Sequence, residues 1–214
     1  VRGITKNVPN SNIWFNSIYI GGTGVGSTAT NTFCLARTSS STDDWRDNIL
    51  VNNRSNATTG GKHYSINLNA TATLTLNYNV YYGNGTGYVF GYNGSTDFGS
   101  YTNGWIAGDA NSWSSDPLFI NPTGSSSAGD LHIDPVNPTI VESTGTNIGT
   151  VTNDFDNQTR SGLTPTDIGA DAGNFTSLVC NGTPPSSTAV VVGGNNSICV
   201  SGTKSLAITG YSGA

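Results

Sequence analysis

The chain has 214 residues, of which only 10% are charged, and its formal net charge is −5. Asn, Thr, Ser and Gly supply 108 of these residues, whereas an ordinary soluble domain carries about 25% charged residues. This composition is typical of turns, β-structure and an extracellular surface, and it argues against long helices. The negative charge argues against a nucleic acid as partner, and no apolar run is long enough to predict membrane insertion.

One short pattern occurs three times between residues 12 and 92. Each copy is an asparagine followed by an apolar run rich in Ile, Val and Tyr, which is strand composition. The opening asparagines are Asn16, Asn48 and Asn79, so they lie 32 and 31 residues apart. A second apolar run follows each copy, at residues 32–36, 63–68 and 88–92. A fixed period of this length indicates a repeat architecture.

The repeat predicts a coil of parallel strands, in which equivalent strands stack about 4.8 Å apart. Asparagines at the same place in successive turns of such a coil can form an amide-to-amide hydrogen-bonded ladder. We therefore expect Asn16, Asn48 and Asn79 to be structural and not ligand-binding. The alternative is an antiparallel sandwich of short strands, which the even spacing disfavours.

The segments around the repeat are more polar. Residues 1–11 are expected to finish a preceding turn of the coil, and residues 37–47 to form a polar loop. From about residue 94 to residue 134 the repeat loosens, and we expect this stretch to cap the open end of the last turn, because an uncovered strand edge recruits other chains. Cys34 lies in an apolar run and is predicted to be a small buried hydrophobe.

The densest charge in the chain falls within residues 37–47 and comprises Asp43, Asp44, Arg46 and Asp47. Polysaccharide lyases use acids to hold Ca²⁺ against a uronate and a basic residue to take the proton, whereas hydrolases use paired acids. These four residues are therefore the candidate catalytic set. Neighbouring repeats add few acids, so a solvated loop is the favoured interpretation.

His132, which lies between Asp130 and Asp134, could bind a metal or act as a base, but a hydrogen-bonded structural histidine is favoured.

The stretch from about residue 12 to residue 173 resembles the right-handed parallel β-helix repeats of very large secreted proteins of Bacteroidota-type bacteria. The resemblance rests on the following segments: "NSIYIGG", "DNILVNNRS", "GGKHYSI", "NYNVYYG", "DPLF", "DLH", "DFDNQTR" and "TPTDIGADAG". The last two resemble the closing signature of that family, from which Asn157 and Ala172 depart. The tail resembles the Ig-like repeats that follow such helices in adhesins exported by the type IX system.

The closing signature implies a role for Arg160. Paired bidentately with one of its aspartates, Arg160 would lock the final segment onto the helix. The aspartates are Asp154, Asp156, Asp167 and Asp171. The alternative is a Ca²⁺ ion held by Asp154, Asp156 and Asp171.

Together these observations predict an all-β chain in three parts. Residues 1–180 would form the C-terminal coils and cap of a right-handed parallel β-helix, and residues 181–188 a linker rich in Pro and Ser. Residues 189–214 would begin an Ig-like β-sandwich and are too few to fold alone. Cys180 and Cys199 could pair with each other or elsewhere.

The predicted function is that of a non-catalytic segment of a large extracellular, bacterial cell-surface protein. It would act as a stalk or as an adhesive surface for glycans or other cell-surface material, with secretion machinery or a surface anchor as further partners. No cofactor is expected, calcium being the one alternative. The alternative function is a carbohydrate-active enzyme, a polysaccharide lyase or glycosidase, whose catalytic turns precede residue 1.

Overall fold

The computed structural model describes residues 1–25, 30–125, 127–163 and 166–179, and these residues form an all-β structure, as the composition predicts. The strands are β1 (Arg2–Lys6), β2 (Asn12–Trp14), β3 (Ser17–Ile20), β4 (Thr32–Arg37), β5 (Asp43–Arg46), β6 (Ile49–Asn52), β7 (His63–Leu68), β8 (Leu74–Asn77), β9 (Val80–Tyr82), β10 (Tyr88–Tyr92), β11 (Asp97–Phe98), β12 (Phe119–Asn121) and β13 (Asp130–Ile133). A short 3₁₀ helix, η1, spans Arg160–Gly162.

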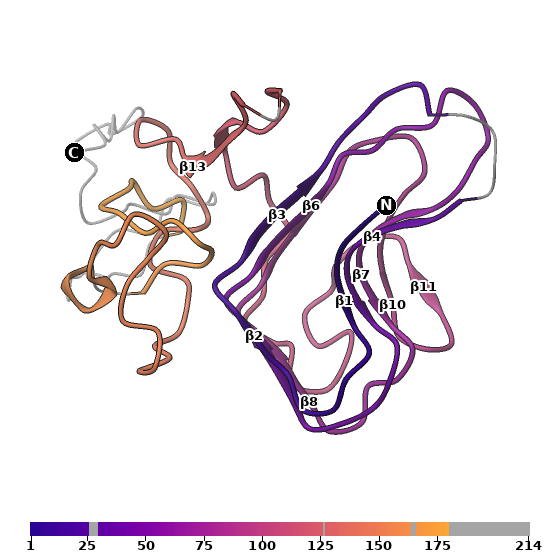
Figure 1. Cartoon of the computed structure of the whole chain (residues 1–214), viewed down its shortest axis with the longest axis horizontal. Helices are drawn as coiled ribbons and strands as arrows, with labels where there is room; N and C mark the ends of the chain where they lie inside the picture. The colour runs from indigo at the N-terminus through magenta and orange to yellow at the C-terminus, as the bar shows by residue number, and fades with distance from the viewer. Residues whose placement is uncertain (26–29, 126, 164–165, 180–214) are drawn as a thin grey trace, which may run out of the picture.

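The first ten strands form three parallel sheets that the chain visits in rotation (Figure 1). The sheet orders are β1-β4-β7-β10, β2-β5-β8 and β3-β6-β9. One pass of the chain, from the first sheet through the second to the third, therefore adds one strand to each sheet. Side chains of equivalent strands therefore lie in register, as Ile18, Leu50 and Tyr81 do along the third sheet. The interval of 31–32 residues between the repeated asparagines is therefore the length of one pass.

The three sheets share one apolar interior. Side chains alternate between the two faces of a strand, and every sheet turns one face toward this interior. Its buried members are Ile20, Cys34, Leu35, Trp45, Leu50, Ile66, Leu68, Leu76, Tyr81, Phe90, Trp105 and Ile106. Cys34 is buried there and its thiol donates to the carbonyl of Val51 at 3.1 Å.

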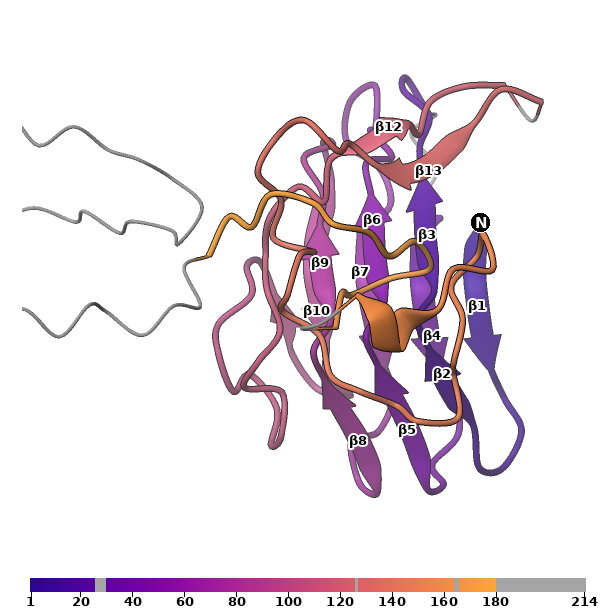
Figure 2. The same cartoon turned by 90° about the vertical axis from the view of Figure 1, so that its left-hand side faces the viewer.

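The outer face of the β3-β6-β9 sheet is covered as well. Its outward side chains Ile49, Val51 and Val80 pack against Ile140 and residues near it, and form a second apolar cluster with Ile133, Val141 and Ile168. Figure 2 shows the C-terminal segment crossing in front of these three strands. The β6 strand is consequently buried on both faces, and all four of its residues are buried.

A glycine allows the close approach of this segment. Gly169 has a φ of +100°, and a Cβ there would lie 2.4 Å from Cδ1 of Ile49. Its N–H donates to the carbonyl of Asp47 at 2.9 Å. Any other residue at position 169 would be strained in its backbone and would collide with the sheet.

The segment after β10 closes the last pass. Trp113 N–H donates to the carbonyl of Asn79, and its own carbonyl accepts the N–H of Tyr81, at 2.8 and 2.9 Å. Trp105 packs into the interior, and its indole N–H donates to the buried carboxylate of Asp109 at 2.6 Å. The edge of β9 is thereby paired instead of being left open to another chain.

The sheets are mixed, which corrects one prediction. The β10–β11 and β12–β13 pairs are antiparallel, and they occur where the chain leaves its regular period. The assignment of residues 12–173 to the right-handed parallel β-helix repeats of type IX-exported proteins is therefore wrong. The predicted linker (181–188), the predicted Ig-like strands (189–214), Cys180 and Cys199 lie outside the described residues.

The three repeated asparagines lie one above another at the start of the third sheet. The Asn16 amide donates to Asn48 Oδ1 at 2.9 Å, and the Asn48 amide donates to Asn79 Oδ1 at 3.1 Å. The same oxygens accept the backbone N–H groups of Asn16 and Asn48, at 3.1 and 3.0 Å. These bonds satisfy donors at the corner where the chain turns from one sheet to the next.

Asn48→Ala is expected to lower the free energy of unfolding by about 2 kcal/mol, because it leaves buried donors and acceptors of the ladder without partners. Chemical denaturation would measure the loss. Asn84→Ala is the matched control, since Asn84 is exposed and its replacement should change stability by less than about 0.5 kcal/mol. Equal effects of the two substitutions would contradict a stabilising ladder.

Candidate functional site

The predicted catalytic set does not converge. Asp43 and Trp45 of β5 are buried, whereas Asp44 and Arg46 point to the opposite face and pair with each other at 2.6 Å. Asp47, just after β5, has a φ of +59° and is buried beneath the C-terminal segment. The interpretation of this stretch as a solvated loop is wrong for residues 43–46, because they form β5 and strand alternation turns Asp43 inward.

Asp43 is the centre of a buried ion network. Its Oδ2 lies 2.9 Å from Nζ of Lys6 and 2.8 Å from Nε of Arg37, and its Oδ1 accepts both the N–H and the hydroxyl of Ser11 at 2.8 Å. Asp43, Lys6 and Arg37 are each less than 5% exposed. Burial raises the pKa of Asp43, but the hydrogen bonds from Lys6, Ser11 and Arg37 outweigh it and hold the pKa well below its usual value.

Two other aspartates are buried where the C-terminal segment meets the β3-β6-β9 sheet. Asp47 Oδ1 accepts the N–H of Thr146 at 2.8 Å, and its Oδ2 has no hydrogen-bond partner in the part of the chain that the structure describes. Asp167 accepts the N–H groups of Ser143 and Gly173, at 2.8 and 3.0 Å. Burial raises the pKa of each carboxyl to about 7. Asp47 and Asp167 are at most 1% exposed, so their perturbed pKa values belong to the packing and not to a site that a substrate reaches.

Arg160 holds the C-terminal segment, but not in the predicted way. Its guanidinium lies over the ring of Phe15, 4.1 Å from the centroid, and donates to the carbonyls of Gly169 and Ala170 at 2.8 and 2.9 Å. The expected bidentate pair with an aspartate is absent from the hydrogen bonds of the described residues. Backbone carbonyls converge on the guanidinium there and take the place of a carboxylate.

The predicted calcium ligands separate into two environments. Asp154 accepts the backbone N–H groups of Gln158 and Ala172, at 2.7 and 3.3 Å, and stabilises its own turn. Asp156 and Asp171 instead lie beside His132, with one potential ligand atom from each of the three residues within 4.8 Å of the others. The residue types of the closing segment give no sign that His132, from β13, joins its acids.

His132 contacts one predicted neighbour and one distant acid. Its Nδ1 lies 2.5 Å from Oδ1 of Asp130, and its Nε2 lies 2.9 Å from Oδ2 of Asp156. Asp134, the other acid near His132 in the sequence, accepts the N–H of Val136 at 2.8 Å. The hydrogen bond to Asp130 raises the pKa of His132, although burial opposes it.

The other histidine, His63, is structural. It is 1% exposed, and its ring nitrogens lie 3.0 Å from Oγ1 of Thr32 and 2.9 Å from Oδ1 of Asn56. Burial lowers the pKa of His63. Its contact with Thr32 joins neighbouring passes of the chain.

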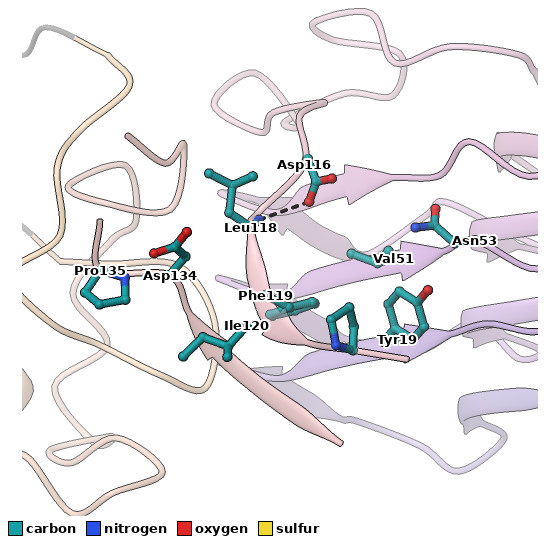
Figure 3. Close-up of a pocket in the computed structure, with 10 residues that line it drawn as sticks. Tyr19, Val51, Asn53, Asp116, Leu118, Phe119, Ile120, Asp134 and Pro135 are labelled. Carbon is teal, nitrogen blue, oxygen red and sulfur yellow. Dashed lines mark hydrogen bonds between the residues drawn. The ribbon is translucent and has the colours of Figure 1, made fainter. Parts of the chain in front are cut away.

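A pocket of about 470 Å³ lies between the outer face of the β3-β6-β9 sheet and the β12–β13 hairpin (Figure 3). Phe119 extends from β12 toward Tyr19 of β3 and Val51 of β6. The residues that line the pocket are Tyr19, Val51, Asn53, Asp116, Leu118, Phe119, Ile120, Pro122, Asp134 and Pro135. Sequence reasoning missed this pocket, because its lining comes from four separate segments of the chain.

Exposed apolar residues flank the pocket. Ile120, in its wall, is 53% exposed, and Val136, which follows its lining residue Pro135, is 79% exposed. The carboxylates of Asp116 and Asp134 accept backbone N–H groups within their own turns, which fixes their positions at the rim. The pocket therefore joins an apolar floor to a few oriented polar groups, which is the usual composition of a small-molecule site.

Comparison with known proteins gives no relative: no family model, curated protein or solved structure matches this chain. The family resemblance drawn from the sequence therefore lacks support from any relative, in addition to its disagreement with the mixed sheets. In the described part of the chain, no helix is long and apolar enough to span a lipid bilayer.

Proposed function

We propose that this chain is a non-catalytic, extracellular module of a cell-surface protein, and that it binds a neutral glycan in the pocket beside Tyr19. The finer architecture that we propose for its first ten strands is a right-handed parallel β-helix, since crossovers between parallel strands of one sheet are right-handed in nearly all proteins. Such a scaffold would hold the pocket on a rigid outer face.

The observation that carries the proposal is the lining of the pocket. Tyr19 and Phe119 offer aromatic surface to the C–H face of a sugar ring, and Tyr19 adds a hydroxyl. Asn53, Asp116 and Asp134 place amide and carboxylate groups around the same space, where sugar hydroxyls can donate and accept hydrogen bonds. A volume of about 470 Å³ suits a short oligosaccharide segment.

Charge favours a neutral glycan over an acidic one. Of the described residues, two carboxylates and no Lys or Arg line the pocket, and the chain as a whole has a net charge of −5. A uronate or sialate would meet like charge without a compensating cation. The low overall charge and the abundance of Asn, Thr, Ser and Gly support the extracellular setting.

The enzymatic alternative would use Asp116 and Asp134 as a carboxylate pair. A glycosidase needs one of its two acids protonated near neutral pH, which requires a raised pKa. The backbone hydrogen bond from Val136 and the contact with Asn137 lower the pKa of Asp134. That direction suits an ionised hydrogen-bond acceptor better than a general acid.

The proposal is tested by screening the purified chain against an array of neutral and uronate-containing oligosaccharides, with calorimetry on the best ligand. Binding to neutral members is expected, with a loss of about tenfold or more in Tyr19→Ala, which corresponds to the 1–3 kcal/mol that aromatic stacking contributes. Asp116→Asn keeps the acceptor for the N–H of Leu118 and should weaken binding less.

The matched control is Tyr92→Ala, a partly buried tyrosine on β10, in a different sheet. Its affinity for the glycan should equal that of the unmodified chain. Preference for uronate-containing ligands, or equal losses in both tyrosine variants, would refute the proposal. Reducing ends released from a bound oligosaccharide, and lost in Asp134→Asn, would instead establish the enzyme.

A further inference from the structure

Three segments bring potential metal ligands together away from the glycan pocket. His132 comes from β13, Asp156 from the turn before η1, and Asp171 from the segment that crosses the β3-β6-β9 sheet. One nitrogen or oxygen atom from each lies within 4.8 Å of the others. Ligands around one tetrahedral ion with bonds of about 2.0–2.1 Å lie about 3.4 Å apart, so small side-chain rotations would complete the site.

The histidine is oriented as metal-binding histidines are. Asp130 Oδ1 accepts the backbone N–H of His132 at 2.9 Å and lies 2.5 Å from its Nδ1. A carboxylate in that position holds the proton on Nδ1 and leaves the lone pair of Nε2 free to coordinate. That lone pair faces Asp156 Oδ2 at 2.9 Å, so a proton or a cation is required between the two acceptors.

Asp171 is the third potential ligand, and its contact with β13 fixes its position. The residue is only 7% exposed. Its Oδ2 accepts the N–H of Ile133 at 2.7 Å, whereas its Oδ1 has no hydrogen-bond partner among the described residues. The side chain lines a second pocket, of about 260 Å³, together with Asp130, His132 and Phe155. An oxygen that faces this pocket is available to a water molecule or to an ion.

We propose that His132, Asp156 and Asp171 bind a divalent transition-metal ion, with zinc as the best fit, and that Asp130 orients the histidine. Calcium takes oxygen ligands, whereas imidazole with carboxylates suits zinc. Three protein ligands leave a fourth position open toward the second pocket, for water or an oxygen ligand. The ion would clamp β13 and the C-terminal segment together. This site is independent of the glycan pocket.

Calorimetric titration with Zn²⁺ and with Ca²⁺ tests the proposal. The chain used carries Cys180→Ser and Cys199→Ser, so that these thiols contribute no ligands. Saturable binding of one Zn²⁺ per chain is expected, with no comparable binding of Ca²⁺ and a raised thermal midpoint in the presence of zinc. His132→Gln and Asp171→Asn should each weaken zinc binding by about tenfold or more, and Asp130→Asn by about 10–100-fold.

Asp134→Asn is the matched control, because Asp134 is near His132 in sequence but bonds to Val136 and Asn137. Its affinity for zinc should be unchanged. Asp171→Asn retains an acceptor for the N–H of Ile133, which separates loss of the ion from loss of the fold. Zinc binding that survives His132→Gln, preference for calcium, or no zinc binding by a folded chain would each overturn the proposal.

Discussion

Asp43→Ala is expected to lower the free energy of unfolding by about 3–5 kcal/mol, the cost of removing one partner from a buried ion pair. The substitution leaves Lys6 and Arg37, each less than 5% exposed, without the carboxylate that both contact. It also removes the acceptor of both Ser11 hydrogen bonds. Urea denaturation at pH 7 would measure the loss.

The adjacent residue is the control. Asp44 pairs with Arg46 on the opposite face of the same strand, where both side chains are about a quarter exposed, and a pair of this kind contributes less than about 1 kcal/mol. Asp44→Ala should therefore have a small effect. A loss below about 1 kcal/mol in Asp43→Ala would show that the buried network does not stabilise the fold.

Asp47→Asn is expected to stabilise the protein at pH 8, by an amount that vanishes at about pH 4. The pKa of Asp47 is about 7 in the folded chain and about 3.9 in an unfolded one. The native state therefore binds more protons between these values, and stability falls as pH rises through that range. Above pH 7 the whole penalty is present, on the order of 2–4 kcal/mol.

Asparagine removes this ionisation while it keeps an acceptor for the N–H of Thr146. It also tolerates the left-handed backbone at position 47, where φ is +59°. The measured quantity is the difference in unfolding free energy between variant and parent at pH 4, 6 and 8. Asp167, whose pKa is also about 7, makes the same pH-dependent contribution to the stability of variant and parent, so it cancels in the difference. A difference that is constant with pH would contradict the assignment to Asp47.

The regular part of the fold could be predicted because it repeats. Asn16, Asn48 and Asn79 occur at nearly equal intervals, and parallel strands in register place such residues side by side. Strand alternation would also have predicted the burial of Asp43, had residues 43–46 been recognised as a strand. The local composition, rich in Asp, Ser and Thr, predicts a loop there, and the cations that neutralise Asp43 come from two other strands.

The candidate sites could not be predicted, because neither follows the repeat. Tyr19 meets Phe119, and His132 meets Asp171, only because the chain folds back across its own outer sheet. The packing of this segment on the sheet depends on complementary shape. Gly169 lies in close contact with Ile49, and the guanidinium of Arg160 lies over the ring of Phe15 and donates to two backbone carbonyls. No local pattern in the sequence specifies which distant surface a polar segment will cover.

The docking of the last segment on the first passes also sets an order of events during synthesis. Ala170 donates to Ser17, 153 positions earlier in the chain, so this contact forms only after nearly all of the described chain has been made. Until residues 140–168 emerge, Ile49, Val51 and Val80 present an uncovered apolar face. At a translation rate of about 5–20 residues per second, that face stays exposed for roughly 4–18 seconds after Val80 is added. The nascent chain is most prone to aggregate in this interval, and a chaperone that binds extended apolar strands would act there.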